Sequence, residues 1–223
     1  DPKGLASARQ YVAKLLVASP EEPAKRVAAP FALDVLASAI DPGLEQRTDE
    51  PPDGNGLREI ARQLFDEREG LPLFARAHLL HAMGVLGLAG PSREALITEL
   101  AAAVHLDGPV ARVVTDGDLL AEHFDSNART SALLLRALLA VDAAHPLVHP
   151  LALGLVQARN GGTWRSTQET AWALLALDAY RTKAAPATSA VTGEVVLGER
   201  SLFRHGFVAA PGSIAPDARS TLP

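Results

Sequence analysis

Residues 126–180 read SNARTSALLLRALLAVDAAHPLVHPLALGLVQARNGGTWRSTQETAWALLALDAY, and this stretch decides the fold. Its apolar residues recur three and four positions apart, as Leu134 and Leu138 do, which is the spacing of a helix with one buried face. Gly161 and Gly162 let the chain reverse between two such segments without a side-chain penalty. We therefore expect helices that pair as antiparallel hairpins.

The segment after the paired glycines carries its own start signal. Ser166, followed three residues later by Glu169, predicts a capping box in which each side chain accepts a hydrogen bond from the other residue's backbone N–H. Trp164 is expected to plug one end of the helical array, and Trp172 lies about two turns further on. Gln168 is expected to bond backbone groups of the preceding turn.

The same periodicity extends through most of the chain. Helices are expected at residues 5–17, 31–40, 57–66, 72–86, 93–104, 127–141, 147–159 and 167–181. Two polar stretches between them, 41–56 and 105–124, are expected to be irregular because proline and glycine interrupt them. Helical hairpins without a repeat of fixed length indicate a mainly α fold, an α/α toroid or a helical solenoid.

The pattern changes after Thr182. Residues 183–190 resemble a linker, and 194–197 and 201–203 alternate as the two strands of a β-hairpin with a turn at 198–199. Two strands do not hold themselves folded, so we expect them to open a β-sandwich domain. The expected domains are a partial helical toroid at 1–184 and the start of an adjoining β-domain at 190–223. Both ends of the chain look like boundaries inside a longer protein.

The amino-acid composition argues against several classes of function. Hydrophobic residues make up 48% of the chain and charged residues 21%, a balance that supports a packed core. The net charge is -5 and Lys and Arg do not cluster, which argues against a nucleic-acid or anionic-membrane surface. The chain has no cysteine, so it has no disulfide, no thiolate metal site and no cysteine nucleophile. No apolar run approaches the roughly 20 residues that span a bilayer.

The stretch 126–180 resembles the last two hairpins of the thioester domain shared by alpha-2-macroglobulins and complement thioester proteins, with residues 71–77 similar to the bacterial branch. The resemblance is carried by three runs in order: TSALL at 130–134, GGTW at 161–164 and STQET at 166–170. It implies a terpenoid-cyclase-like α/α toroid followed by a CUB- or macroglobulin-like β-domain. The motif residues are expected to be structural rather than catalytic: Gly161, Gly162, Trp164, Ser166, Thr167, Gln168, Glu169, Thr170 and Trp172.

The resemblance also implies a function for the longer protein. Members of the family are broad-spectrum endopeptidase inhibitors that trap proteases, and bacterial members are periplasmic or extracellular and often lipid-anchored. The implied partners are trapped proteases and other domains of the same polypeptide, with no nucleic acid and no insertion into a membrane by this segment. The family's reactive thioester joins Cys and Gln within a C-x-E-Q motif. Since this segment has no cysteine, it cannot form that bond, and the run GLEQ at 43–46 is a chance match.

Other constellations give weaker signals. His78 and His81 are three apart, and His145 and His149 are four apart, but neither pair has the third ligand that a zinc site needs. We expect all four at the surface or in caps, and we assign no catalytic, cofactor or metal residue.

Two alternatives remain beside the protease-trapping module. One is a helical protein-interaction scaffold. The other is a toroid enzyme, such as a glycosidase with paired carboxylates, for which the candidate acids are Asp116, Asp118 and Asp125 near His123. The few aromatic residues, 4% of the chain, disfavour a sugar-binding cleft. A terpenoid cyclase would need an acidic D-x-D-D cluster, which the sequence lacks.

Overall fold

The computed structural model describes residues 2–16, 23–39, 54–115, 125–184, 191–197 and 200–207. The chain divides into two compact units, Asp1–Ala184 and Ala185–Pro223. The first is mainly helical, and its helices are α1 (Pro2–Leu16), α2 (Pro23–Ser38), α3 (Gly54–Asp66), the 3-10 turn η1 (Arg68–Gly70), α4 (Leu73–Val85), α5 (Pro91–Ala102), α6 (Asn127–Val141), α7 (Val148–Gln157) and α8 (Thr167–Lys183). Helix formation was thus correctly predicted for all eight segments, with shifts at most of the ends.

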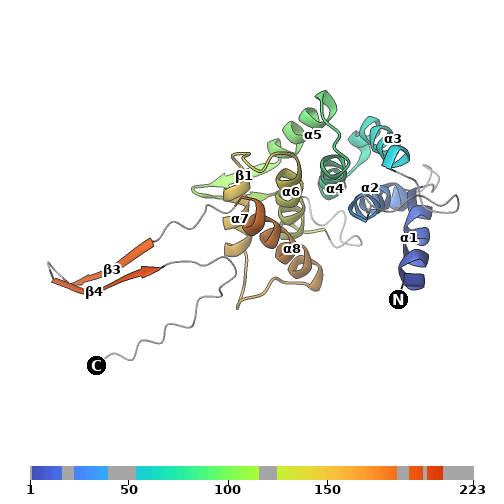
Figure 1. Cartoon of the computed structure of the whole chain (residues 1–223). Coiled ribbons are helices and arrows are strands. Elements are labelled where there is room, and N and C mark those ends of the chain that lie inside the picture. The colour runs from blue at the N-terminus through green and yellow to red at the C-terminus, as the bar shows by residue number, and fades with distance from the viewer. Residues whose placement is uncertain are drawn as a thin grey trace. The chain divides into compact units, whose positions relative to one another are not determined.

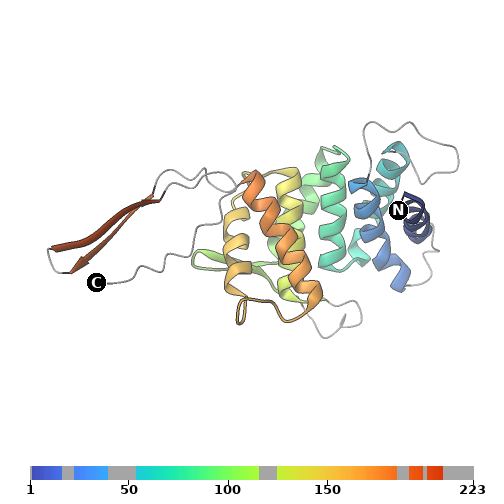
Figure 2. The same cartoon turned by 60° about the horizontal axis from the view of Figure 1, so that its bottom comes forward.

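The even-numbered helices of the first unit form a row. Helix α2 packs on α4, α4 on α6 and α6 on α8, which Figure 2 shows as a sequence of helices from blue to orange. The odd-numbered helices form a second layer: α3 packs on α2 and α4, α5 on α4, and α7 on α6 and α8, while α1 packs on α2. The described residues therefore form a two-layer helical array. That this array is part of an α/α toroid stays a prediction.

The described residues contain two buried apolar clusters, and the larger one runs along this array. It includes Leu33 of α2, Leu79 of α4, Leu134 of α6, Leu151 of α7 and Ala176 of α8, all with no more than 1% of their surface exposed. Burying a leucine side chain contributes roughly 1.5–3 kcal/mol. The apolar spacing in the sequence thus predicts which face of each helix turns inward.

Helix α2 begins at Pro23, earlier than the start at residue 31 that the sequence indicated. Pro30 lies inside the helix, where it lacks a backbone N–H and so removes one helical hydrogen bond. The helix continues through it because Ala29 and Leu33, on either side, are buried in the core. The packing of α2 in the core thus outweighs the cost of placing a proline inside the helix.

Residues 104–113 form a β-hairpin where an irregular stretch was expected from residue 105. Strands β1 (Val104–Asp107) and β2 (Val110–Val113) pair antiparallel, with Val104 opposite Val113. Gly108 adopts φ 57, a left-handed conformation that suits a tight turn. Strand β2 packs against α6 and α7, and its Ala111 and Val113 are buried. This contact with two helices stabilises strands too short to hold together alone.

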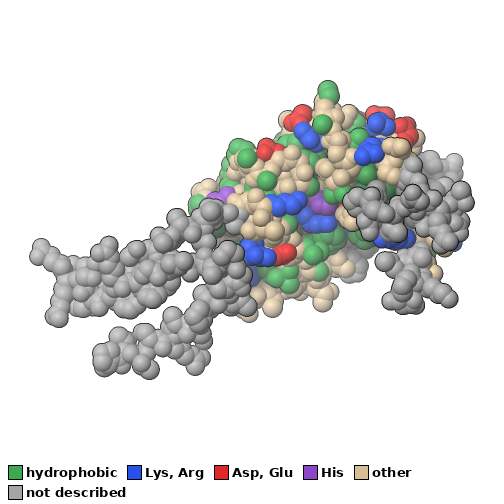
Figure 3. Space-filling view, in the orientation of Figure 1, with side chains coloured by type: hydrophobic (Ala, Val, Ile, Leu, Met, Phe, Trp, Pro, Cys, Tyr) green, Lys and Arg blue, Asp and Glu red, His purple; other side chains and the backbone are tan. Residues whose placement is uncertain are grey.

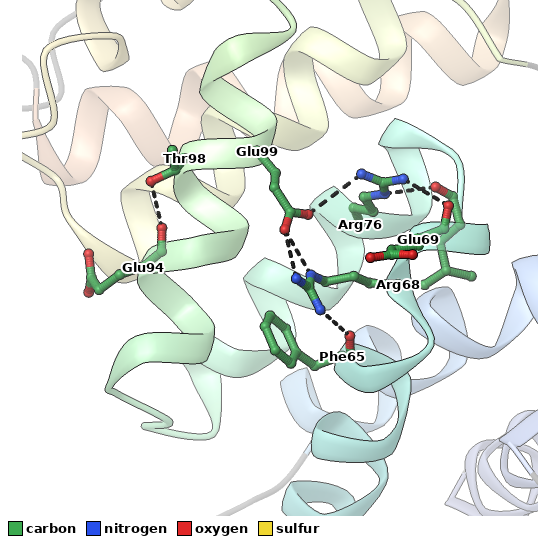
Figure 4. Close-up of polar contacts among 8 residues, drawn as sticks. Phe65, Arg68, Glu69, Arg76, Glu94, Thr98 and Glu99 are labelled. Carbon is green, nitrogen blue, oxygen red and sulfur yellow. Dashed lines mark hydrogen bonds and ion pairs between the residues drawn. The ribbon is translucent and has the colours of Figure 1, made fainter.

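Ion pairs join α5 to the segment that leads into α4 (Figure 4). Glu99 of α5 accepts from Arg68 of η1, with Nη2 and Oε1 2.9 Å apart, and lies 3.6 Å from Nη1 of Arg76 on α4. Arg68 also donates to the carbonyl of Phe65 and covers its ring at 3.9 Å. Glu99 and its arginines are partly shielded from solvent, so these contacts help to set the position of α5.

The second unit contains a hairpin, as expected. Strands β3 (Val191–Leu197) and β4 (Arg200–Phe207) pair antiparallel, with a register irregularity between Val195 and Val196. They are longer than the four and three residues that the alternation indicated. That this hairpin opens a β-sandwich stays a prediction.

Candidate functional site

The helical unit contains a buried carboxylate held by two histidines. Asp34 of α2 is 2% exposed, and its Oδ2 and Oδ1 accept hydrogen bonds from Nδ1 of His78 at 2.7 Å and Nδ1 of His81 at 2.6 Å. Both histidines lie on α4, three residues apart and therefore on one face, and that face meets α2. The packing of α2 on α4 assembles the cluster.

Two further side chains complete the shell of Asp34. Arg136 of α6 lies with Nη1 3.2 Å from Oδ2 of Asp34, and Ser38 donates a long hydrogen bond of 3.4 Å to Oδ1. The carboxylate thus receives donors from three helices. We call Asp34, His78, His81 and Arg136 the Asp34 cluster.

Aromatic rings enclose His78. The rings of Phe31 and Trp172 meet it edge to face, with centroids 5.4 Å and 5.1 Å away. Arg136 lies over the Trp172 ring at 5.5 Å, a cation–π distance. Trp172 therefore connects α8 to the Asp34 cluster, a role that the sequence analysis did not assign to it.

A cavity of about 290 Å³ opens beside the cluster. Its lining residues come from α2, α6 and α8: Asp34, Val35, Ser38, Ala39, Arg136 and Trp172. On the face drawn in Figure 3, basic side chains and a histidine lie close together near the centre of the helical unit.

The electrostatics fix the charge states of Asp34 and His78. Burial raises the pKa of Asp34, but the hydrogen bonds and charges of His78 and His81 outweigh it and hold that pKa well below its usual range. Burial lowers the pKa of His78 more than Asp34 raises it, and Arg129 and Arg136 lower it further. At neutral pH Asp34 is therefore ionised and His78 is neutral.

This arrangement determines the tautomer of His78. A neutral His78 that donates from Nδ1 to Asp34 has its lone pair on Nε2, and that atom is buried with no hydrogen-bond partner among the described residues. Nε2 of His78 is therefore a buried hydrogen-bond acceptor that no described residue satisfies. Within the described part of the chain no group of three His, Cys, Asp or Glu residues has the arrangement of a metal site.

The histidine placement corrects the sequence analysis. His78 and His81 are 1% and 8% exposed and bind a carboxylate, whereas we expected them at the surface or in caps. Asp34 was missed altogether. A signal was present, since all three polar residues interrupt the apolar runs FALDVLASAI and HLLHAMGVLGL, and a charge inside such a run needs a partner. His149 is exposed, as expected, whereas His145 is half-buried and its Nδ1 accepts from the backbone N–H of Leu147.

The paired glycines lie where the sequence analysis placed them, in the turn from α7 to α8. Gly161 and Gly162 have φ 61 and φ 92, left-handed values that glycine adopts at little cost. Trp164 follows, 8% exposed, and its Nε1–H donates to the carbonyl of Leu155 at 3.1 Å. The indole therefore closes the end of α7 from the turn that precedes α8.

The helix start at Ser166 differs in one bond from a capping box. The Ser166 hydroxyl accepts from the N–H of Glu169 at 3.1 Å, but Oε2 of Glu169 accepts from the N–H of Arg165 rather than from that of Ser166. Thr167 begins α8, and Thr170 donates to the carbonyl of Ser166. Gln168 is exposed and makes no side-chain hydrogen bond to the described residues, so its expected bonds to the preceding turn are not formed.

Some candidate residues lie outside the described ranges, namely the run 43–46 and Asp116, Asp118 and His123. Asp125 is described, and its Oδ1 accepts from the hydroxyl of Thr130 at 2.7 Å near the start of α6. This contact gives Asp125 a local structural partner.

Family models and curated proteins give no match from which to assign a function. Among the described residues, no helix combines the length and apolarity needed to cross a membrane.

Proposed function

We propose that the helical unit is a non-catalytic structural module of a broad-spectrum, protease-trapping inhibitor of the alpha-2-macroglobulin kind. In this proposal the described helices are most of an α/α toroid, and the β3–β4 hairpin begins the adjoining β-domain. The parent protein would act in the periplasm or outside the cell, with a lipid anchor as one option. Its partners would be the trapped proteases and its own neighbouring domains.

The observation that carries the proposal is the turn between α7 and α8. The resemblance to the thioester domain is strongest there, and several motif residues, though not Gln168, have a local structural task. The glycines reverse the chain, Trp164 seals the end of α7, and Ser166 caps α8. A motif whose residues serve architecture supports a module that holds other parts of a protein in place.

The absence of cysteine limits what this module contributes. The segment cannot form a Cys–Gln thioester, so its own part in trapping is mechanical. We assign it no catalytic, cofactor-binding or metal-binding residue.

An entrapment assay on the full-length protein tests the proposal. A protease mixed with an excess of that protein should keep cleaving a small chromogenic peptide but lose most of its activity on a large protein substrate. The matched control is the same protein unfolded and quenched beforehand, which should protect neither substrate. If the native protein leaves the same fraction of protease activity on the large substrate as on the small one, protease trapping is refuted.

Mass spectrometry separates two forms of the proposed inhibitor. Methylamine treatment adds one methylamine and exposes a thiol if the full-length protein carries a thioester elsewhere. An unchanged mass together with a positive entrapment assay would indicate a purely mechanical trap.

A helical interaction scaffold is the second candidate function. Leu174 and Leu175 of α8 are 57% and 53% exposed, so α8 offers apolar side chains that a partner protein could cover. A negative entrapment assay would favour this alternative. Replacing both leucines with serine should then abolish binding of a partner protein that the wild type retains in a pull-down experiment.

A further inference from the structure

We propose that the cavity beside Arg136 and Trp172 binds a carboxylate group. It lies between α2, α6 and α8 and measures about 290 Å³, near the lower limit of small-molecule sites. Space of this size accepts one acidic side chain or a small organic acid. The proposal concerns a binding activity and is independent of protease trapping.

Arg136 is the residue that we expect to bind the carboxylate of the ligand. Its guanidinium has five N–H donors in a planar fork, and the contact with Asp34 engages only Nη1. The remaining donors have no partner among the described residues, and the side chain is 21% exposed at the cavity. An arginine with unused neighbouring donors matches the two oxygens of a carboxylate.

The surroundings hold that guanidinium in place. Asp34 fixes one nitrogen, and His78 and His81 in turn fix Asp34. Trp172 lies against the guanidinium at 5.5 Å and also lines the cavity. A donor group that is already oriented loses less entropy when a ligand binds.

The hydrogen-bonding groups of the cavity favour an anion over a cation. Asp34 is the acidic residue of the lining, and its oxygens already accept from two histidines, Arg136 and Ser38. A metal ion or an amine would have to displace these donors beside a fixed positive charge. A second arginine lies nearby, because Arg9 of α1 donates to the carbonyl of Ala39, a residue of the cavity wall.

Calorimetric titration of the full chain tests the proposal. The probes are acetyl-Ala-Glu-Ala-amide, its Gln counterpart, succinate and succinamide. The wild type should bind each carboxylate saturably and at least about 10-fold more tightly than its matched amide, since the amide lacks the charge-assisted bond. Tighter binding of the peptide than of succinate would indicate a protein segment as the natural ligand, and the reverse order a free organic acid.

Variants assign the binding to Arg136. Arg136→Gln should weaken carboxylate binding by at least about 10-fold. Arg136→Lys, which keeps the charge beside Asp34 but lacks the fork, should weaken it as well. Arg62→Gln removes an exposed arginine of α3 and should leave binding unchanged. Equal affinity for carboxylate and amide in the wild type, no binding of either, or unchanged binding in a folded Arg136→Gln protein would overturn the proposal.

Discussion

Trp164 illustrates how one residue of the turn stabilises the helical unit. Its indole is 8% exposed and closes the end of α7 through a hydrogen bond to Leu155. We expect Trp164→Ala to lower the free energy of unfolding by roughly 3–5 kcal/mol, because a large cavity and an unpaired carbonyl remain. Urea unfolding followed by circular dichroism measures the change.

The matched control for Trp164 is Leu174→Ala, which truncates a side chain that is 57% exposed on α8. It should change the stability by no more than about 0.5 kcal/mol. If Trp164→Ala costs less than about 1 kcal/mol, the indole does not seal the array, and the turn loses its structural role.

His78 gives the helical unit a pH-dependent stability. Its pKa in the folded state lies below the ordinary value of 6.5, so between these two values the unfolded chain binds more protons. Stability is therefore fully present above about pH 6.5 and falls as the pH drops, by at most about 1.4 kcal/mol per pH unit for one proton. A second loss follows below 3.8, the ordinary pKa of an aspartate, because folding lowers the pKa of Asp34.

Urea unfolding at half-unit steps from pH 7.5 to pH 5 measures the effect of His78. The groups that face this histidine are Asp34, Arg129, Arg136 and, through Asp34, His81. His78→Asn keeps a donor near the position of Nδ1 and removes the titration, so the slope should flatten. Leu174→Ala, at an exposed position of α8 with no titratable group, should keep the wild-type slope. An unchanged slope in His78→Asn would show that this residue does not carry the dependence.

At the residue scale, the contacts of the Asp34 cluster could not be predicted from the sequence. Helical spacing places His78 and His81 on one face, but the sequence alone does not show that Asp34 lies opposite them. Their pairing depends on the register in which α2 packs on α4, and Asp34 is 44 residues from His78. Local contacts such as the one between Ser166 and Glu169 are easier to predict from the sequence, because both residues lie within one helical turn. Even there the carboxylate of Glu169 accepts from the N–H of Arg165, one residue before the expected donor Ser166.

At the scale of elements, α7 and β2 approach each other closely at Gly154. A Cβ built on Gly154 would overlap the carbonyl oxygen of Ala111, and the backbone cannot yield as a side chain does. Gly154→Ala gains roughly 1 kcal/mol of helix propensity, yet the overlap should make the net change a loss of about 1–3 kcal/mol. Thermal and urea unfolding measure it.

Val156→Ala on the same helix is the control for Gly154, since Val156 is 41% exposed. It should leave stability within about 0.5 kcal/mol of wild type. A Gly154→Ala protein that is more stable than wild type would mean that helix propensity prevails and that β2 does not press against α7.

Long periodic elements are the ones that the sequence predicts well. Helix α6 begins and ends at Asn127 and Val141 as its leucine spacing indicated. The β1–β2 hairpin was missed, because strands of four residues carry too little alternation to be distinguished from a loop. Its stability comes from α6 and α7, and such long-range contacts have no local signature.

At the scale of the helical unit, the continuous core predicts cooperative unfolding. The same buried cluster contains Leu33 of α2, Leu134 of α6 and Trp164 beyond α7. The buried polar Asp34 cluster lies beside this core, and its hydrogen bonds join α2, α4 and α6 rather than separating them. Loosening one end therefore exposes apolar surface at the next helix, and the helices are expected to unfold together.

A core variant far in sequence from the tryptophans tests this cooperativity. Leu33→Ala in α2 should lower the free energy of unfolding by about 2–5 kcal/mol, because Leu33 is completely buried. Circular dichroism reports all the helices, whereas tryptophan fluorescence reports Trp164 and Trp172 near α8. Both transitions should shift to the same lower urea concentration, and Arg62→Ala, at an exposed position, should shift neither. If the dichroism shifts while the fluorescence does not, α2 unfolds separately from α8, and the helical unit is not one cooperative body.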